Sequence, residues 1–427
     1  MKPAKYAVPG DFHPDLDEIV SSKAFRRLSH KSQVMVKPTR DHFRSRLIHT
    51  IEVNNIGLAI GSQLNLNMTL ISAMAMAHDI GHTPFAHAGE RTIREVLRRE
   101  LVTTFGVSER QLDDRRVFHH SDNSARLLLN KFDSVKLSVI KGVSTHSWAP
   151  WKKNDPTNNP IPETYEAQVL AIADQLASIN HDTEDIIEGE AYTNYDAKKF
   201  SQEMRKWMKS KKPPPDLNAK LSSFLSIAES GYGRRSRIKV MVDQIVRAAK
   251  ETINSNSVRS YTQARQYPIT IDKNWCIFLS LYESFIRDVV IKKESWFVGR
   301  DSIAEALVST VFNHIWPLFK AGQVGQLPLP FKDDASKGRI ERETHSIEHY
   351  QKFHEEEYGT KSLTNVIKKK FDIKTWDAYI VDKISSAIVR EHPERVLRLI
   401  SIIDFVSGLT DRYCLEIFDR VYHGFTI

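Results

Sequence analysis

Residues 68–78 (MTLISAMAMAH) form an almost wholly apolar stretch that leads directly into a polar segment. The stretch is typical of a short buried helix that ends at His78, because Gly81 and Pro84 follow it. The adjacent His78 and Asp79 would then be carried into the interior, away from water. A buried ionised carboxylate is costly unless it is paired or bound to a metal. The sequence therefore predicts a helical core that holds polar groups.

Apolar residues at helical spacing recur along most of the chain, whereas strand-like alternation is scarce and no internal repeat is present. The segments with the helical pattern are 44–60, 87–101, 121–140, 164–182, 237–253, 302–321, 376–391 and 394–423. Loops are expected at 147–163, at 209–218 with its three consecutive prolines, and at 322–338. The chain is therefore expected to be mainly α, with many helices.

Length and composition limit the classes of protein to which the chain can belong. A chain of 427 residues is long enough for two to three domains or one large helical body. No run of about 18 uninterrupted apolar residues occurs, and the N-terminus lacks the apolar stretch of a signal peptide. Cys276 and Cys414 lie far apart, which excludes a disulfide scaffold and a cysteine-rich zinc site. We expect a cytoplasmic protein that does not enter a membrane.

The net charge of +8 favours anionic partners, either nucleotides or nucleic acid, although a soluble protein can also simply be basic. The segment GRRSRIKV concentrates four basic residues, Arg234, Arg235, Arg237 and Lys239. These side chains are candidates for phosphate contact, and a solvated basic face is the alternative.

The adjacent His78 and Asp79 cannot make a full metal site alone, so further ligands must come from elsewhere in the chain. His49 lies at the edge of the apolar face of 44–60, and Asp174 interrupts the apolar stripe of 164–182. Two imidazoles and two carboxylates suit a divalent first-row metal, or magnesium with added waters. Taken singly, such residues are more commonly satisfied core groups or caps, so spacing alone leaves the set a hypothesis.

Longer motifs surround these four residues. The order of a histidine, then His-Asp, then a distant aspartate resembles the HD phosphohydrolase superfamily. Several blocks resemble, more closely, the deoxyguanosine triphosphate triphosphohydrolase family: SSKAFRRLSHKSQV, RDHFRSRLIHTIEV, AMAHDIGHTPFAHAGE, YEAQVLAIADQLASINHDTED and, near the end, ISIIDFVSGLTDRYCLEIF. The resemblance covers roughly residues 20–185 and 395–420.

The resemblance implies a multi-helical HD-domain fold. It places a catalytic core at 46–185, an N-terminal segment at 1–45 that leads into the core, and a helical C-terminal region at 186–427 that packs on the core and contributes to oligomer contacts. The implied reaction is metal-dependent hydrolysis of dGTP, or of several dNTPs, at the α-phosphorus. Its products are a deoxynucleoside and tripolyphosphate, and the metal is Mn²⁺, Mg²⁺ or another first-row ion.

The resemblance also assigns residues to roles. The metal ligands of the family match His49, His78, Asp79 and Asp174. The active-site histidine and its carboxylate partner fall on His87 and Glu90, three residues apart at the start of a helix. We expect His87 to transfer a proton and Glu90 to orient it, with a simple capping arrangement as the alternative for this pair.

The resemblance also implies which residues contact the substrate. Arg46 matches an arginine that contacts phosphate, while His82 and His120 match pocket residues close to the phosphates. Gln33 matches a glutamine that binds the sugar, and Asp182 an aspartate at its 3′ hydroxyl.

Two positions depart from the pattern of relatives. Ser178 stands where many relatives have a tyrosine that packs against the sugar, so we expect an altered sugar or base preference, another aromatic side chain filling the space, or a weaker catalyst. His119 stands where many relatives carry a glutamate, and no role is assigned to it.

Relatives assemble as tetramers or hexamers, and some are activated by a second nucleotide. A homo-oligomer is therefore expected, and a nucleotide activator is left open. One alternative function is an HD-type phosphodiesterase or nucleotidase that acts on another nucleotide. A nuclease or single-stranded DNA-binding protein is suggested by charge, although no repeated aromatic and basic pattern is present. A regulatory protein with a dead site is disfavoured by the intact ligand set.

Overall fold

The computed structural model describes a chain built from helices. The described residues are 3–33, 44–113, 117–132, 134–152, 160–188, 196–212, 233–291, 295–320, 376–384, 388 and 393–423. No β-strand occurs within these ranges, which confirms the expected mainly α fold. Within the same ranges, no helix is both long enough and apolar enough to cross a membrane.

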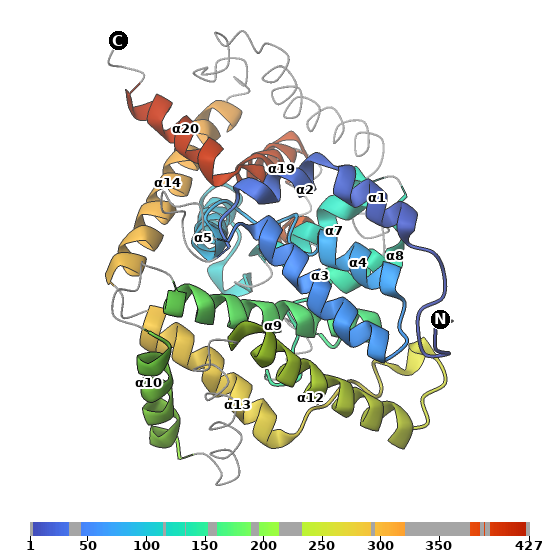
Figure 1. Cartoon of the computed structure of the whole chain (residues 1–427). Coiled ribbons are helices and arrows are strands. Elements are labelled where there is room, and N and C mark those ends of the chain that lie inside the picture. Colours follow the sequence, from blue (N-terminus) through green and yellow to red (C-terminus); the bar gives the residue numbers. More distant parts are fainter. Residues whose placement is uncertain are drawn as a thin grey trace. The chain divides into compact units, whose positions relative to one another are not determined.

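The chain forms two compact units, and Figure 1 labels the helices from which they are built. The first comprises Met1–Ser29, Lys37–Ile80 and Leu127–Val298, and the second comprises His30–Val36, Gly81–Arg126 and Gly299–Ile427. Each unit gathers segments that are distant in the sequence. The domain limits expected at residues 45 and 185 remain a prediction.

The first unit is organised around α3 (Arg46–Gln63), α4 (Met68–Ala77) and α9 (Tyr165–Glu188), which pack on one another. Around them lie α1 (His13–Ser21), α2 (Lys23–Arg27), α8 (Leu137–Ser144), α10 (Ala197–Ser210), α12 (Gly233–Ser255) and α13 (Lys273–Ser284), which a π-helix extends over Phe285–Val290. Glycine lets α8 approach α4 closely, because a Cβ at Gly142 would lie 2.1 Å from Met74 Sδ.

The second unit contains α5 (Ala86–Thr103), α17 (Trp376–Lys383), α19 (Pro393–Gly408), α20 (Asp411–His423) and the greater part of α7 (His120–Lys131) and α14 (Ser295–Lys320). Its core includes Leu97, Val308, Phe312, Ile400 and Ile403, which are at most 1% exposed. Burying such side chains is the main favourable contribution to the free energy of folding.

A buried arginine joins three helices of the second unit. The guanidinium of Arg126 on α7 donates to Asp377 of α17 at 2.6 Å and to Asp404 of α19. All three side chains are almost inaccessible to water. Because the charges are matched and hydrogen-bonded, the unit can bury them.

Two segments that the sequence presents as continuous helices are each divided. Segment 121–140 becomes α7 and α8, because the turn between them is held by α1: Asp15 Oδ1 accepts from the Lys136 backbone N–H at 2.6 Å. Segment 394–423 becomes α19 and α20. There Thr410 Oγ1 accepts from the Tyr413 N–H at 3.1 Å, which starts a new helix.

Some of the other helix ends and loops expected from the sequence agree with the structure, and others differ or lie outside the described residues. Helix α4 ends at Ala77 with His78 as its cap, as expected. Helix α14 begins at Ser295, before the expected start, and contains Pro317. The loop expected at 322–338 lies outside the described residues, and so do parts of the loops at 147–163 and 209–218 and of the helix expected at 376–391.

Candidate functional site

Helices α3, α4 and α9 bring four side chains together in the first unit. His49 comes from α3, His78 and Asp79 from the end of α4, and Asp174 from α9. Nε2 of His49 lies 2.9 Å from Asp174 Oδ1 and 3.9 Å from Asp79 Oδ2. Nε2 of His78 lies 3.4 Å from Asp79 Oδ2 and 3.8 Å from Asp174 Oδ1. The four residues that the sequence singled out therefore converge.

The spacing of these donor atoms fits a metal ion. Nitrogen and oxygen ligands at about 2.0–2.2 Å from a metal stand roughly 3.0–3.5 Å from their neighbours. Nδ1 of His78 lies 2.7 Å from the Ala75 carbonyl, which only accepts, so that nitrogen carries the hydrogen. Nε2 of His78 faces the carboxylates and is the nitrogen that would bind a metal, giving up its hydrogen as the metal binds.

Buried charge dominates this cluster, whose four side chains are at most 8% exposed. Burial acts to lower the pKa of His78, yet Asp79 and Asp174 raise it to about 9. Burial acts to raise the pKa of Asp174, but a hydrogen bond with His49 and the charge of His78 hold it below its ordinary value. Burial lowers the pKa of His49. The centre therefore concentrates negative charge where a cation can offset it.

Arg46 lies one helical turn before His49 and forms a buried ion pair with Asp79. Its guanidinium therefore already neutralises part of the charge of the centre. The expected phosphate contact of Arg46 remains a prediction.

Two further histidines, which the sequence did not single out, line the same centre. His146 follows α8, and its Nε2 lies 3.8 Å from Asp79 Oδ1. Its Nδ1 lies 2.7 Å from the Val143 carbonyl, the same arrangement as in His78. His181 lies two helical turns after Asp174 on α9, and its Nδ1 lies 3.1 Å from His49 Nδ1. The i, i+7 spacing from Asp174 was the available signal for His181.

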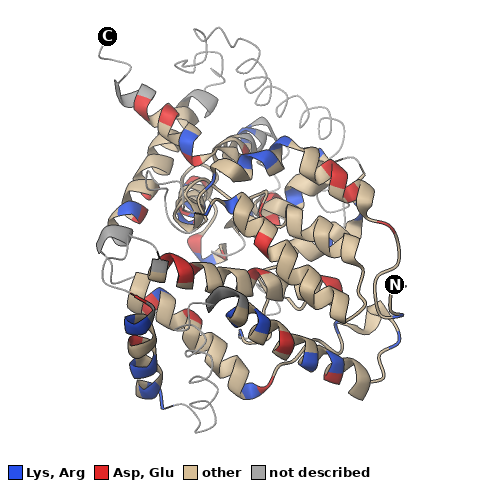
Figure 2. Cartoon of the chain, in the orientation of Figure 1, with Lys and Arg blue, Asp and Glu red and all other residues tan. Residues whose placement is uncertain are grey.

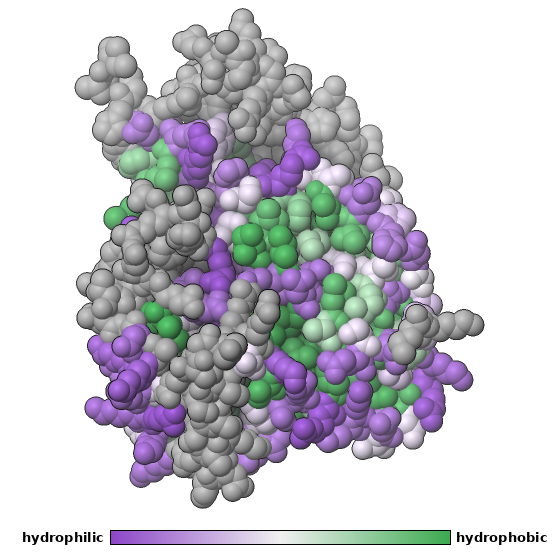
Figure 3. Space-filling model, viewed as in Figure 1, coloured by the Kyte–Doolittle hydropathy of each residue, from purple (hydrophilic) through white to green (hydrophobic). Residues whose placement is uncertain are grey.

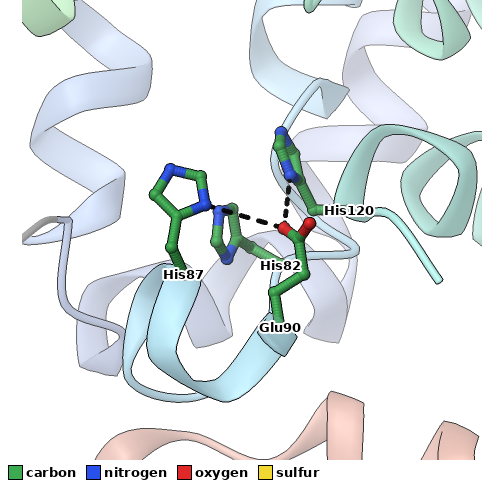
Figure 4. Close-up of side chains that lie close together, drawn as sticks. All are labelled: His82, His87, Glu90 and His120. Atoms are coloured by element: carbon green, nitrogen blue, oxygen red, sulfur yellow. Dashed lines mark hydrogen bonds and ion pairs between the residues drawn. The ribbon is translucent and has the colours of Figure 1, made fainter. Parts of the chain in front are cut away.

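A second cluster lies in the second unit and comprises His82, His87, Glu90 and His120 (Figure 4). Their donor atoms all lie within 4.8 Å of one another, so the cluster could also hold a metal ion. Glu90 Oε2 lies 2.8 Å from His120 Nδ1 and 3.7 Å from His87 Nδ1. The rings of His82 and His120 stack with centroids 4.5 Å apart. The carboxylate thus contacts both imidazoles, His120 more closely than His87.

Glu90 is held as an anion. Burial acts to raise its pKa, but His119 and His120 bring the pKa well below its ordinary value. Arg94 Nη2 also donates to Glu90 Oε1 at 2.6 Å. The side chain of His87, in contrast, is 64% exposed. An ionised carboxylate therefore lies beside an imidazole that solvent can reach.

The turn before α5 places His87. Phe85 and Ala86 have φ values of 57° and 53°, which L-residues rarely adopt. Asp411 of α20 holds this turn, since its Oδ1 accepts from the Phe85 N–H at 2.8 Å and its Oδ2 from the Ser32 N–H at 2.9 Å. A side chain at Gly89 would place Cβ 2.0 Å from Pro84 O, so only glycine fits.

The segment before Gln33 is fixed in the same way. The buried Lys31 donates to the carbonyl of His82 and, at 3.1 Å, to that of Ser407. Gln33 itself is half-buried. The expected sugar contact of Gln33 remains a prediction.

Asp182 on α9 has an unusual environment in the first unit. Burial, with Asp185 and Glu283 nearby, raises its pKa to about 8, and Arg44 acts in the opposite direction. Ser178, also on α9, is half-buried. The expected role of Asp182 at the sugar remains a prediction.

The basic segment of α12 is not a uniform solvated face. Arg237 is 3% exposed, and its Nε donates to Asn180 Oδ1 at 3.2 Å. Lys239 is exposed and lies 3.5 Å from Asp243. The side chains of Arg234 and Arg235 lie outside the described part of the chain.

Comparison with known proteins places these residues in a family context. Residues 46–179, which contain all four residues of the first cluster, match the HD domain family. The chain is 42% identical over 179 residues to a deoxyguanosinetriphosphate triphosphohydrolase-like protein of Caldanaerobacter subterraneus subsp. tengcongensis, covering 42% of this chain and 46% of that protein. A protein of the same description from Clostridium tetani is 40% identical over 181 residues, or 41% and 46% of the two chains.

The match to these two relatives thus spans about half of their length. A third protein of the same description, from Roseobacter denitrificans, is 26% identical over 436 residues, covering 97% of this chain and 92% of that protein. Similarity to proteins of this description therefore extends along nearly the whole chain.

Proposed function

Because the chain carries an HD domain and belongs with the deoxyguanosinetriphosphate triphosphohydrolase-like proteins, we propose that it is a phosphohydrolase and, more specifically, a metal-dependent deoxynucleoside triphosphate triphosphohydrolase. The proposed substrates are dGTP or several dNTPs, and the products are a deoxynucleoside and tripolyphosphate. The observation that carries the proposal is the convergence of His49, His78, Asp79 and Asp174 at distances that suit a divalent cation.

In this proposal the four converging side chains hold the cation, which is Mn²⁺, Mg²⁺ or another first-row ion. When bound, the cation supplies positive charge at the α-phosphate. Arg46 balances Asp79 and presents a planar, permanently charged group that suits a phosphate oxygen. His82 and His120 contact the phosphates, while Gln33 and Asp182 hold the sugar.

Hydrolysis at the α-phosphorus has a simple balance of atoms. The oxygen of one water forms a bond to phosphorus while the bond to the 5′ oxygen breaks; the water gives up one proton, and the departing oxygen takes one up. We assign that proton transfer to His87, whose imidazole solvent can reach. Glu90 orients the imidazole, because its ionised carboxylate is itself held by His120 and Arg94.

We further propose a homo-oligomer, either a tetramer or a hexamer. Figure 3 shows apolar side chains at the surface of the face in view, and on α3 the side chains of Ile48 and Ile51 are 44% and 40% exposed. Two apolar groups one turn apart on one helix suit a contact with another subunit. Sedimentation of the purified chain tests this, since a monomer at micromolar concentration contradicts it.

Nucleotide activation and single-stranded DNA binding remain predictions. Lysine and arginine run along α10 (Figure 2), where Lys198, Lys199, Lys206 and Lys209 are exposed. This charge suits an anionic partner, whose binding would weaken as salt rises.

The decisive experiment follows the products. Purified protein is incubated with each dNTP and each ribonucleotide, with Mn²⁺ or Mg²⁺, and tripolyphosphate is separated from orthophosphate and pyrophosphate. We expect tripolyphosphate from at least one dNTP, and no signal from His78→Ala or Asp79→Ala. Asp243→Asn, an exposed aspartate on α12, should keep full activity. Fully active His78→Ala or Asp79→Ala would contradict the site, and cleavage of monophosphates or cyclic nucleotides instead would indicate the alternative HD phosphodiesterase or nucleotidase.

A further inference from the structure

A chain of polar contacts extends outward from the candidate metal centre. His181 on α9 is 2% exposed, and its Nδ1 lies 3.1 Å from Nδ1 of His49. The two rings meet at 76° with centroids 5.1 Å apart. On its other side, Nε2 of His181 contacts the carboxylate of Glu52. These contacts therefore run from the carboxylate of Glu52 through His181 to His49, a candidate metal ligand.

The chemistry of the three side chains fixes where the hydrogens lie along this series of polar contacts. Glu52 as a carboxylate only accepts, so Nε2 of His181 carries a hydrogen. An imidazole that carries its hydrogen on Nε2 offers a lone pair at Nδ1. Nδ1 of His49, at hydrogen-bond distance, must donate to it. Nε2 of His49 is consequently the nitrogen that can offer a lone pair to a cation bound beside Asp174 and Asp79.

We propose that His181 and Glu52 are positioning residues that hold His49 in the tautomer and orientation needed to bind the metal. The inference rests on the metal centre of the proposed function. It extends that centre by two residues that contact neither substrate nor metal. Such outer partners fix ring orientation and raise the basicity of the ligand nitrogen.

Glu52, His181 and His49 form a relay of contacts, and two helices position its members. Glu52 lies one turn after His49 on α3, and His181 lies two turns after Asp174 on α9. Arg44 Nε lies 3.5 Å from Glu52 Oε2, so a positive charge stands beside the carboxylate that contacts His181. The same arginine also binds Glu184 and Asp185. Because α3 and α9 each supply a candidate ligand and a relay member, a shift of either helix would disturb both.

The test measures metal affinity without nucleotide. Mn²⁺ is titrated into the full-length protein and the free ion is followed by electron paramagnetic resonance. His181→Ala should raise the Kd for Mn²⁺ about 10- to 100-fold. Glu52→Gln should raise it less, because the amide oxygen of glutamine still accepts a hydrogen bond but lacks the charge. Asp174→Ala should abolish binding.

Glu184→Gln is the matched control. It removes another carboxylate that contacts Arg44 and leaves the contact between Glu52 and His181 in place, so the Kd should stay at the wild-type value. Thermal unfolding without metal checks that each variant is folded, and Glu52→Gln serves if His181→Ala does not fold. At saturating Mn²⁺ the turnover of His181→Ala should recover toward wild type, which a general structural defect would not allow.

The relay is wrong if folded His181→Ala and Glu52→Gln bind Mn²⁺ as the wild type does, or if Glu184→Gln weakens binding as much as Glu52→Gln. These outcomes are separate from the proposed reaction, because no nucleotide is present. A protein whose affinity for Mn²⁺ depends on His181 and Glu52 but that releases no tripolyphosphate would refute the reaction and support the positioning role of these two residues. A wild-type protein that binds no Mn²⁺ would refute the metal centre and the relay together.

Discussion

The two histidine-rich clusters differ most in their access to water. In the first unit every candidate ligand is at most 8% exposed, and helices α3, α4 and α9 fix its position. In the second unit His87 is 64% exposed, while its neighbour Glu90 is buried. A closed set of donors suits an ion that must be held, whereas an open imidazole suits a group that exchanges protons. The same residue types are thus suited to different tasks by their different burial.

The largest expected effect tests this division directly. His87→Ala should lower kcat about 100- to 10,000-fold, the usual contribution of a general acid or base, and leave the Kd for Mn²⁺ unchanged. Asp174→Asn should lose both activity and metal binding. Steady-state kinetics and Mn²⁺ titration on the two variants provide the measurement. Weakened Mn²⁺ binding in His87→Ala would contradict the assignment of metal binding to the first cluster alone.

An intermediate effect concerns the turn that carries His87. Asp411→Ala removes the acceptor for the N–H groups of Phe85 and Ser32, leaving buried donors without their partner. We expect a loss of about 1–3 kcal/mol in the free energy of unfolding, measured with urea, and a lower kcat at unchanged affinity for Mn²⁺. Asp411→Asn keeps an acceptor and should fall between Asp411→Ala and wild type. A wild-type kcat in Asp411→Ala would show that the turn at Phe85 keeps its conformation without Asp411.

The smallest effect is a pH dependence in the first unit. The pKa of Asp182 is raised to about 8 by burial, so its protonated form stabilises the folded state fully at low pH, and that contribution is lost as the pH rises toward 8. Between about pH 4 and pH 8, the free energy of unfolding of the wild type should fall relative to that of Asp182→Asn as the pH rises. Urea unfolding of both proteins across this range is the measurement. Parallel pH profiles would show that Asp182 ionises normally.

The sequence predicted the first cluster better than its surroundings. Asp174 was visible because it interrupts an apolar stripe, and His78 with Asp79 because they end an apolar helix. His146, in a turn after α8, gave no comparable signal, and the i, i+7 spacing of His181 from Asp174 reveals neither the neighbour of His181 nor its tautomer. Their contacts with Asp79 and His49 arise only when the helices pack.

The expectation of a mainly α fold was confirmed because helical periodicity is a local property. The divisions within 121–140 and 394–423 were missed because distant or capping side chains create them. Asp15 on α1 fixes the turn before α8, and Thr410 starts α20. Similarly, the positive φ values of Phe85 and Ala86 depend on Asp411, more than three hundred residues away in the sequence.

That last contact bears on how the molecule matures during synthesis. A ribosome that has translated through α19 has already produced His82, His87, Glu90 and His120, but it has not yet supplied the carboxylate that closes the Phe85 turn. The nascent polypeptide therefore acquires its histidines early and their final geometry late. The Phe85 turn can close only after residue 411 has left the exit tunnel and folded back.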